Sequence, residues 1–166
     1  MEIYEQGLDE YSKSNIVISN FLMAFWIGLG TIACWFFYSL IAWIYLFSAI
    51  IMVFIVLRKL VCINCYYYNK WCYMGWGKLS ALFFKKGNIK NFKTSTGLKI
   101  APLTYGLLSI VPLTLIFISI FQEFLLSKLI VLILLILVSS YSIGGRKKIC
   151  KNCKMRIICP GSAAKI

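Results

Sequence analysis

The chain has 166 residues, of which 61% are hydrophobic and 16% aromatic, and its formal net charge is +13. A soluble domain is usually about 45–50% apolar, so this composition is typical of an integral membrane protein and excludes an ordinary water-soluble domain. The sequence contains no histidine, which excludes bis-His haem, His-containing zinc sites and Ser-His-Asp or Cys-His catalysis.

The N-terminal segment, residues 1–15, is polar and acidic, and no positively charged stretch or small-residue cleavage site precedes the first apolar run. We therefore do not expect a cleaved signal peptide. Residues 16–57 then include 42 positions without a charged side chain. One helix needs about 20 residues to cross roughly 30 Å of hydrocarbon. This run therefore predicts a first transmembrane hairpin, with helices near 16–36 and 39–57 and a tight turn around 37–39.

Residues 58–100 form a basic loop that contains cysteines. Within it, Trp76, Leu79 and Phe83 recur at helical spacing with lysines among them. This pattern predicts a short interfacial helix, with its aromatic rings at the level of the lipid headgroups and its lysines toward phosphate. The three tyrosines at 66–68 are interpreted as further interface anchors.

Residues 101–145 predict a second transmembrane hairpin. Its first apolar run covers about 102–121 and contains Pro112, where a kink is tolerated if neighbouring groups satisfy the freed carbonyl. Its second run extends from Leu129 to about Ile143, and Gly144-Gly145 predicts the end of that helix. The predicted fold class is all-α, with four transmembrane helices as two tandem hairpins.

The distribution of charge predicts the orientation of these helices. Nine basic residues lie between Arg58 and Lys99 and seven lie in the tail, residues 146–166, so the two regions hold 16 of the 18 lysines and arginines. A hairpin separates the two regions, so they share one face, and the positive-inside bias places that face in the cytosol. We expect a multi-pass protein of the cell (inner) membrane with both termini cytosolic. No charged side chain lies inside an apolar run, which disfavours ion-coupled transport.

One basic sequence motif occurs twice in the chain. RKLVCINC at residues 58–65 returns as RKKICKNC at residues 146–153, an offset of 88 residues. Because each copy follows a predicted hairpin, we interpret the chain as a parallel internal repeat, with a pseudo-two-fold axis along the membrane normal. The alternative is coincidence, because Arg-Lys after a membrane helix and Cys-x2-Cys are both common. A duplication would bring the two cysteine-bearing segments together beneath the bilayer.

Six of the seven cysteines lie in two cysteine knuckles, which are Cys62, Cys65 and Cys72 in the first and Cys150, Cys153 and Cys159 in the second. A Cys-x2-Cys turn lets two thiolates converge on one ion, but three ligands are one short of a tetrahedral site. Two knuckles together would supply six ligands for zinc or an iron–sulfur cluster. Reducing conditions in the cytosol favour metal binding over disulfides, and the surrounding lysines and arginines are expected to lower the thiol pKa values.

The leading interpretation is a small membrane protein with a Cys-ligated metal centre at its cytosolic face. Zinc would make it a structural or partner-docking subunit, and an iron–sulfur cluster would make it an electron-transfer subunit. The alternatives are a membrane thiol–disulfide oxidoreductase, S-acylated cysteines, inert thiols and a soft-metal transporter. Only Cys34 lies on a transport path, and it is expected to be a buried structural thiol. No catalytic residue is assigned.

Basic residues beside the predicted membrane helices are expected to contact anionic lipid headgroups, at about 1 kcal/mol each. They are Arg58, Lys59, Lys78, Lys85, Lys86, Arg146, Lys147 and Lys148. The same charge would suit an acidic protein partner. It does not favour nucleic acid, because a positive-inside loop already accounts for the lysines.

Overall fold

The computed structural model describes residues 3–164, so residues 1–2 of the predicted N-terminal segment and 165–166 of the predicted tail lie outside the described chain. It contains four helical spans long and apolar enough to cross a bilayer. They are α1 (Lys13–Trp35), a composite span over Ser39–Asn64, α5 (Thr96–Gln122) and α6 (Leu126–Lys151). The prediction of an all-α protein with four membrane-spanning helices is confirmed at this level.

The composite span changes its helical type along its length. It begins with α2 (Ser39–Ile50), passes through the π-helical segment η1 (Ile51–Val56) and continues as α3 (Leu57–Val61) and the 3-10 turn η2 (Cys62–Asn64). The predicted helix over 39–57 therefore begins where expected and ends seven residues later. As a result, Arg58 and Cys62 lie on the end of a helix and not in a loop.

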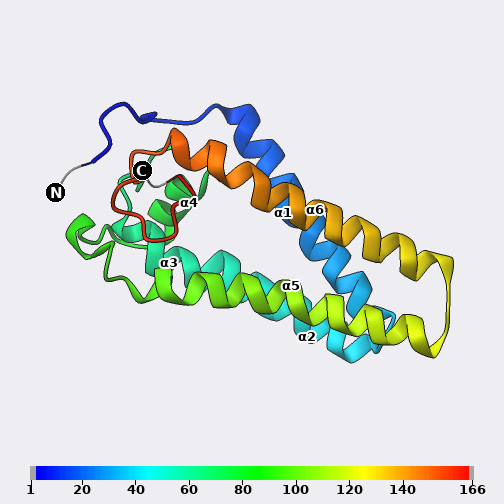
Figure 1. Ribbon diagram of the computed structural model, residues 1–166. Coiled ribbons are helices and arrows are strands. Elements are labelled where there is room, and N and C mark those ends of the chain that lie inside the picture. The colour runs from blue at the N-terminus through cyan, green and yellow to red at the C-terminus, as the bar shows by residue number, and fades with distance from the viewer. Residues whose placement is uncertain (1–2, 165–166) are drawn as a thin grey trace.

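The two hairpins lie side by side, and their connecting turns meet at one end of the molecule (Figure 1). The opposite end carries both termini, the short helix α4 (Trp76–Phe83) and the 3-10 turn η3 (Ile89–Asn91). We call this end the cap and define it as residues 3–12, 62–95 and 150–164. Helix α1 is central to the bundle, because it contacts α2, α5 and α6. The helix predicted around Trp76, Leu79 and Phe83 is confirmed as α4.

The predicted end of the last helix at Gly144-Gly145 is wrong. Helix α6 continues through both glycines to Lys151, and neither glycine has a positive φ. Glycine ends a helix when it adopts the left-handed conformation, but inside a helix it costs only about 1 kcal/mol relative to alanine. The extra turns place Cys150 on the last turn of α6. Cys62 has the equivalent place at the end of the composite span.

Apolar side chains cover the outside of the bundle. Phe21, Phe47 and Phe121 are 69%, 58% and 77% exposed, whereas a soluble bundle presents polar residues on that face. Ala33, Ala42 and Ala49 are fully buried. Small residues at helix contacts let the backbones approach closely, and this is how membrane helices associate when lipid removes the hydrophobic driving force.

Pro112 lies inside α5 and removes the amide that would otherwise bond the carbonyl of Leu108, four residues earlier. The Tyr45 hydroxyl from α2 donates to that carbonyl at 2.9 Å. Gly30 of α1 makes room for this tyrosine, because a Cβ atom there would collide with the Tyr45 hydroxyl. A neighbouring group therefore satisfies the carbonyl freed by Pro112, which is the condition under which a proline is tolerated inside a membrane helix.

Polar contacts also tie the helices together. The indole N–H of Trp26 in α1 donates to Ser139 Oγ in α6 at 3.2 Å, and Ser119 Oγ in α5 donates to the Phe36 carbonyl at the end of α1 at 2.9 Å. At the end opposite the cap, the Lys128 ammonium donates to the carbonyls of Ser119 and Glu123 at 3.0 and 3.1 Å. A cation at this position satisfies the last carbonyls of α5 and complements its dipole.

Candidate thiol site

Both cysteine knuckles lie in the cap. The first starts at the end of the composite span and runs to the beginning of α4, and the second starts on the last turn of α6 and runs into the tail. Cys62, Cys65, Cys72, Cys150 and Cys153 are half-buried thiols, and Cys65, Cys72, Cys153 and Cys159 pack against a buried cluster of Tyr11, Tyr67, Phe92 and Met155. The two knuckles therefore share one core at the same end of the bundle.

The backbone turns of the two knuckles match at the offset of 88 residues. The Cys65 amide bonds the Cys62 carbonyl at 3.3 Å, and the Cys153 amide bonds the Cys150 carbonyl at 3.2 Å. The next two turns correspond as well, with amide-to-carbonyl bonds from Tyr68 to Cys65 and Lys70 to Tyr67 in the first knuckle, and from Arg156 to Cys153 and Ile158 to Met155 in the second. The knuckles diverge afterwards, where their third cysteines follow at different spacings.

Backbone amides point at three of the sulfurs. The sulfur of Cys65 accepts from the Tyr67 amide, and the sulfur of Cys153 accepts from the Met155 amide, two residues later in each case. The Cys72 sulfur accepts from the Gly77 amide at 3.4 Å. Gly77 is needed there, because a Cβ atom would collide with the Tyr67 carbonyl. Amide-to-sulfur bonds of this kind favour a thiolate over a thiol.

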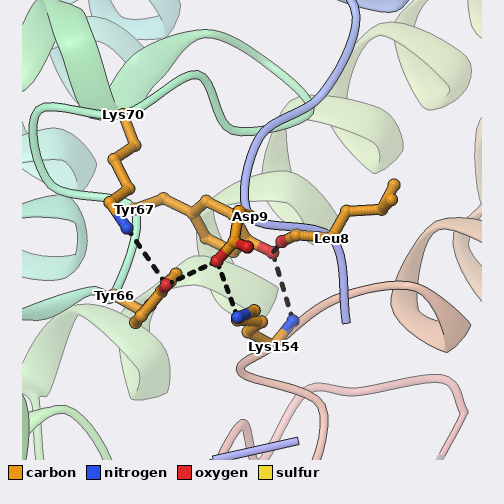
Figure 2. Close-up of polar contacts among 6 residues, drawn as sticks. All are labelled: Leu8, Asp9, Tyr66, Tyr67, Lys70 and Lys154. Carbon is orange, nitrogen blue, oxygen red and sulfur yellow. Dashed lines mark hydrogen bonds and ion pairs between the residues drawn. The ribbon is translucent and has the colours of Figure 1, made fainter. Parts of the chain in front are cut away.

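Tyr67 connects the first knuckle to the rest of the cap. Its hydroxyl donates to the Leu8 carbonyl at 2.6 Å and accepts from the Lys154 amide at 3.1 Å (Figure 2). The N-terminal segment runs alongside the second knuckle, with the Leu8 amide bonded to the Asn152 carbonyl at 2.9 Å. The chain from Tyr4 to Tyr11 is therefore held between the two knuckles. Interface anchoring does not fit Tyr67, which is only 3% exposed.

An ion pair at the surface also joins the N-terminal segment to the second knuckle. The Lys154 ammonium lies 2.6 Å from an Asp9 carboxylate oxygen, which also accepts from the Tyr66 hydroxyl at 2.8 Å (Figure 2). The hydrogen bonds from Lys154 and Tyr66 lower the pKa of Asp9, and the bond to Asp9 raises the pKa of Lys154. The pair contributes most between these two pKa values and weakens as pH falls through that of Asp9 or rises through that of Lys154.

The expected lowering of thiol pKa values by basic residues is wrong for Cys62, Cys65 and Cys153. Burial raises the pKa of all three thiols above the ordinary value, to about 12 for Cys62, and neighbouring cysteines add to the effect. All three are therefore neutral thiols at pH 7 in the absence of a ligand, because burial disfavours the charged thiolate. A thiol nucleophile needs a lowered pKa, so this environment disfavours thiol–disulfide exchange.

Within residues 3–164, no group of three or more cysteine, aspartate or glutamate side chains is arranged to hold a metal ion. The sulfurs nevertheless lie near one another, because Cys65 interacts electrostatically with Cys62 and Cys72 of its own knuckle and with Cys153 of the other. A site with four ligands would require these side chains to turn toward a common centre.

The basic residues predicted at the membrane surface divide into two groups. Lys59, Lys78, Lys85, Lys86, Arg146, Lys147 and Lys148 are exposed. Arg58 is only 2% exposed, because the rings of Phe54 and Trp76 cover it, so its side chain is not presented to headgroups as expected. The sequence contains no signal for this burial, which depends on where Trp76 packs.

An open pocket of about 480 Å³ reaches one side of Cys65. Asn64, Lys70, Lys86 and Asn88 supply most of its polar lining. The pocket gives solvent and small solutes access to the first knuckle from the surface of the cap.

Four apolar spans with an apolar exterior define this chain as a multi-pass membrane protein with a folded cap at one end. The chain matches no protein-family model, no curated protein sequence and no solved structure.

Proposed function

We propose that the cap is a metal-binding module, in which thiolates from both knuckles hold zinc or an iron–sulfur cluster at the cytosolic face of the membrane. The observation that carries the proposal is the repeated arrangement of Cys65 and Cys153: each follows the same turn, accepts a backbone amide two residues on and packs against the same aromatic cluster. The matched turns also support an origin of the two halves by tandem duplication.

Metal binding fits the protonation of the thiols. Cysteine ligands bind as thiolates, so an ion releases their protons to solvent and then stabilises the buried negative charge. The amides directed at Cys65, Cys72 and Cys153 would remain as hydrogen-bond donors to the metal-bound sulfurs. Without a metal, burial keeps Cys62, Cys65 and Cys153 neutral and unreactive.

The orientation follows from charge. Residues 58–99 and 146–166, which include the two knuckles, hold 16 of the 18 lysines and arginines, and the positive-inside bias assigns such regions to the cytosol, with both termini on that side. The seven exposed basic residues would hold the cap against anionic headgroups or an acidic partner. Zinc would make the cap a rigid docking surface for a partner, and an iron–sulfur cluster would make it an electron carrier.

The test is elemental analysis and an absorption spectrum of the protein purified without oxygen. We expect zinc or iron bound with the protein, and a brown colour if the metal is iron. Replacement C65S is expected to remove the metal and lower the melting temperature, because a structural zinc can contribute on the order of 10 kcal/mol of apparent binding free energy.

The matched control is C34A, which removes a buried thiol from α1, away from the cap. This variant should keep the full metal content. Wild-type protein that carries neither zinc nor iron, and takes up neither when reconstituted, would refute the proposed function.

A further inference from the structure

Arg58 is a buried cation whose hydrogen bonds are incomplete. Its guanidinium lies 4.7 Å from the ring centres of both Phe54 and Trp76, and the side chain is 2% exposed. Its Nε and Nη1 atoms have no hydrogen-bond partner within residues 3–164. Aromatic faces attract a guanidinium but accept little from its N–H groups, so two donors point into protein without an acceptor.

No carboxylate within residues 3–164 forms an ion pair with this guanidinium, and none is among the charged groups that act on it. The ion pair found there joins Lys154 to Asp9, and Glu123 lies at the opposite end of the bundle. Leaving a buried cation without a counter-charge is strongly unfavourable. Some anionic group is therefore expected beside Arg58 in the working protein.

The nearest anionic candidates are the sulfurs of the first knuckle. Cys62 follows Arg58 by four residues on the same helix end, and its amide bonds the Arg58 carbonyl. Cys72 is tied by its sulfur to the amide of Gly77, the residue after Trp76, whose ring stacks on Arg58. A thiolate at Cys62 or at Cys72 would interact favourably with the guanidinium.

We infer that Arg58 is a positioning residue of the metal site, whose unpaired N–H groups donate to the thiolates of Cys62 and Cys72 and offset their charge when the metal is bound. The inference rests on the proposed function. A divalent ion held by four thiolates carries a net charge of −2, so a buried cation beside two of the ligands would strengthen the site. This role also accounts for the orphaned donors of Arg58.

The other half of the chain supplies no second cation of this kind within the described residues. Arg146 occupies the equivalent position before Cys150, but it is exposed, and its Nη2 atom donates to the Gly161 carbonyl at 3.4 Å. Of the two arginines that begin the copies of the repeated motif, only Arg58 is buried beside the cysteines. Arg58 is thus the member of the pair to test.

The experiment measures Zn²⁺ affinity by competition with a chelator, together with the melting temperature of the metal-free protein, for wild type, R58M, R58K and K59M. R58M should bind Zn²⁺ about 10- to 100-fold more weakly than wild type, the usual effect of losing a group that supports the ligands. R58K keeps the charge and should recover most of the affinity. K59M removes an exposed charge from the same helix and should change little.

Stability and affinity should move in opposite directions in R58M. The metal-free variant should melt at the same temperature as wild type or higher, because an uncompensated buried charge has been removed. An arginine with a merely structural role would instead lower the melting temperature on replacement. If R58M does not fold, R58Q, which keeps donors without the charge, takes its place with the same expected loss of affinity.

The outcomes separate the two proposals. Wild-type protein that binds neither Zn²⁺ nor iron overturns the proposed function and this inference together. Wild-type protein that binds Zn²⁺ with an affinity equal to that of folded R58M, or of R58Q in its place, overturns the inference alone and leaves the metal centre standing.

Discussion

The hydroxyl group of Tyr67 joins three segments of the cap. It lies between the Leu8 carbonyl of the N-terminal segment and the Lys154 amide of the second knuckle, while the tyrosine itself belongs to the first. Its ring also packs against Tyr11, with the ring centres 5.9 Å apart. A single oxygen atom therefore links residues that are 59 and 87 positions away in the chain.

Removing that oxygen should loosen the cap without disturbing the bundle. In Y67F the Leu8 carbonyl loses its donor and the buried Lys154 amide loses its acceptor, at a cost of about 1–3 kcal/mol. We expect limited proteolysis to release the N-terminal segment from the variant while the four spans stay intact. The adjacent Y68F is the matched control, because it removes a hydroxyl that bonds only the Phe84 carbonyl. Equal resistance of Y67F and wild type would contradict this role.

At this scale the sequence predicts the kinds of residue in the cap but not their partners. The spacing of the six cysteines indicates one shared site, and the structure brings them to one end of the molecule. The place of the N-terminal segment between the knuckles, and the burial of Arg58, both depend on contacts between segments far apart in sequence. A single sequence contains no direct record of such pairing.

Among the helices, a hydrogen bond between α2 and α5 depends on a proline. Pro112 leaves the Leu108 carbonyl without a helical donor, and the Tyr45 hydroxyl supplies one from α2. In lipid an unsatisfied carbonyl has no water to bond, so Y45F should destabilise the bundle by about 1–2 kcal/mol. Equilibrium unfolding in mixed detergent micelles measures this loss.

The effect of Y45F should vanish in a P112A background, because the alanine of that variant has an amide that can bond the Leu108 carbonyl within α5. The double-mutant cycle of Y45F and P112A thus isolates the hydroxyl-to-carbonyl bond from the packing of the ring. If Y45F costs as much in the P112A background as it does beside the native Pro112, the loss does not come from the bond to the Leu108 carbonyl.

The existence of the helices is easier to predict than their ends. Runs of about 20 apolar residues specify spans, because the thickness of hydrocarbon sets the length. The ends of the helices depend on side chains that bond the free backbone groups of the terminal turns. Ser12 Oγ accepts from the Asn15 amide at 3.4 Å, and α1 therefore begins at Lys13, three residues before the predicted start at residue 16. The other three spans also continue beyond their apolar runs into polar sequence, with ends at Asn64, Thr96 and Lys151. A window of hydrophobicity does not detect helical turns outside the hydrocarbon.

The molecule as a whole is asymmetric along its length. One end consists of two short turns, at residues 36–38 and 123–125, and the other carries both termini and both knuckles. Sixteen of the 18 lysines and arginines fall in the regions that lead into the knuckle-bearing end. Because translocation of short basic segments is disfavoured, the positive-inside bias predicts that only the two turns reach the outer side.

Labelling of intact cells with a membrane-impermeant maleimide tests this orientation. Y38C and E123C place a thiol at the exposed side chains of the two turns and should each be labelled without permeabilisation. K86C places one on the exposed surface of the cap and should be labelled only after the membrane is opened, whereas the covered native cysteines of the wild type should stay unlabelled in intact cells. Labelling of K86C in intact cells would reverse the orientation. It would place the knuckles on an oxidising face, where permanent disulfides become the expected state.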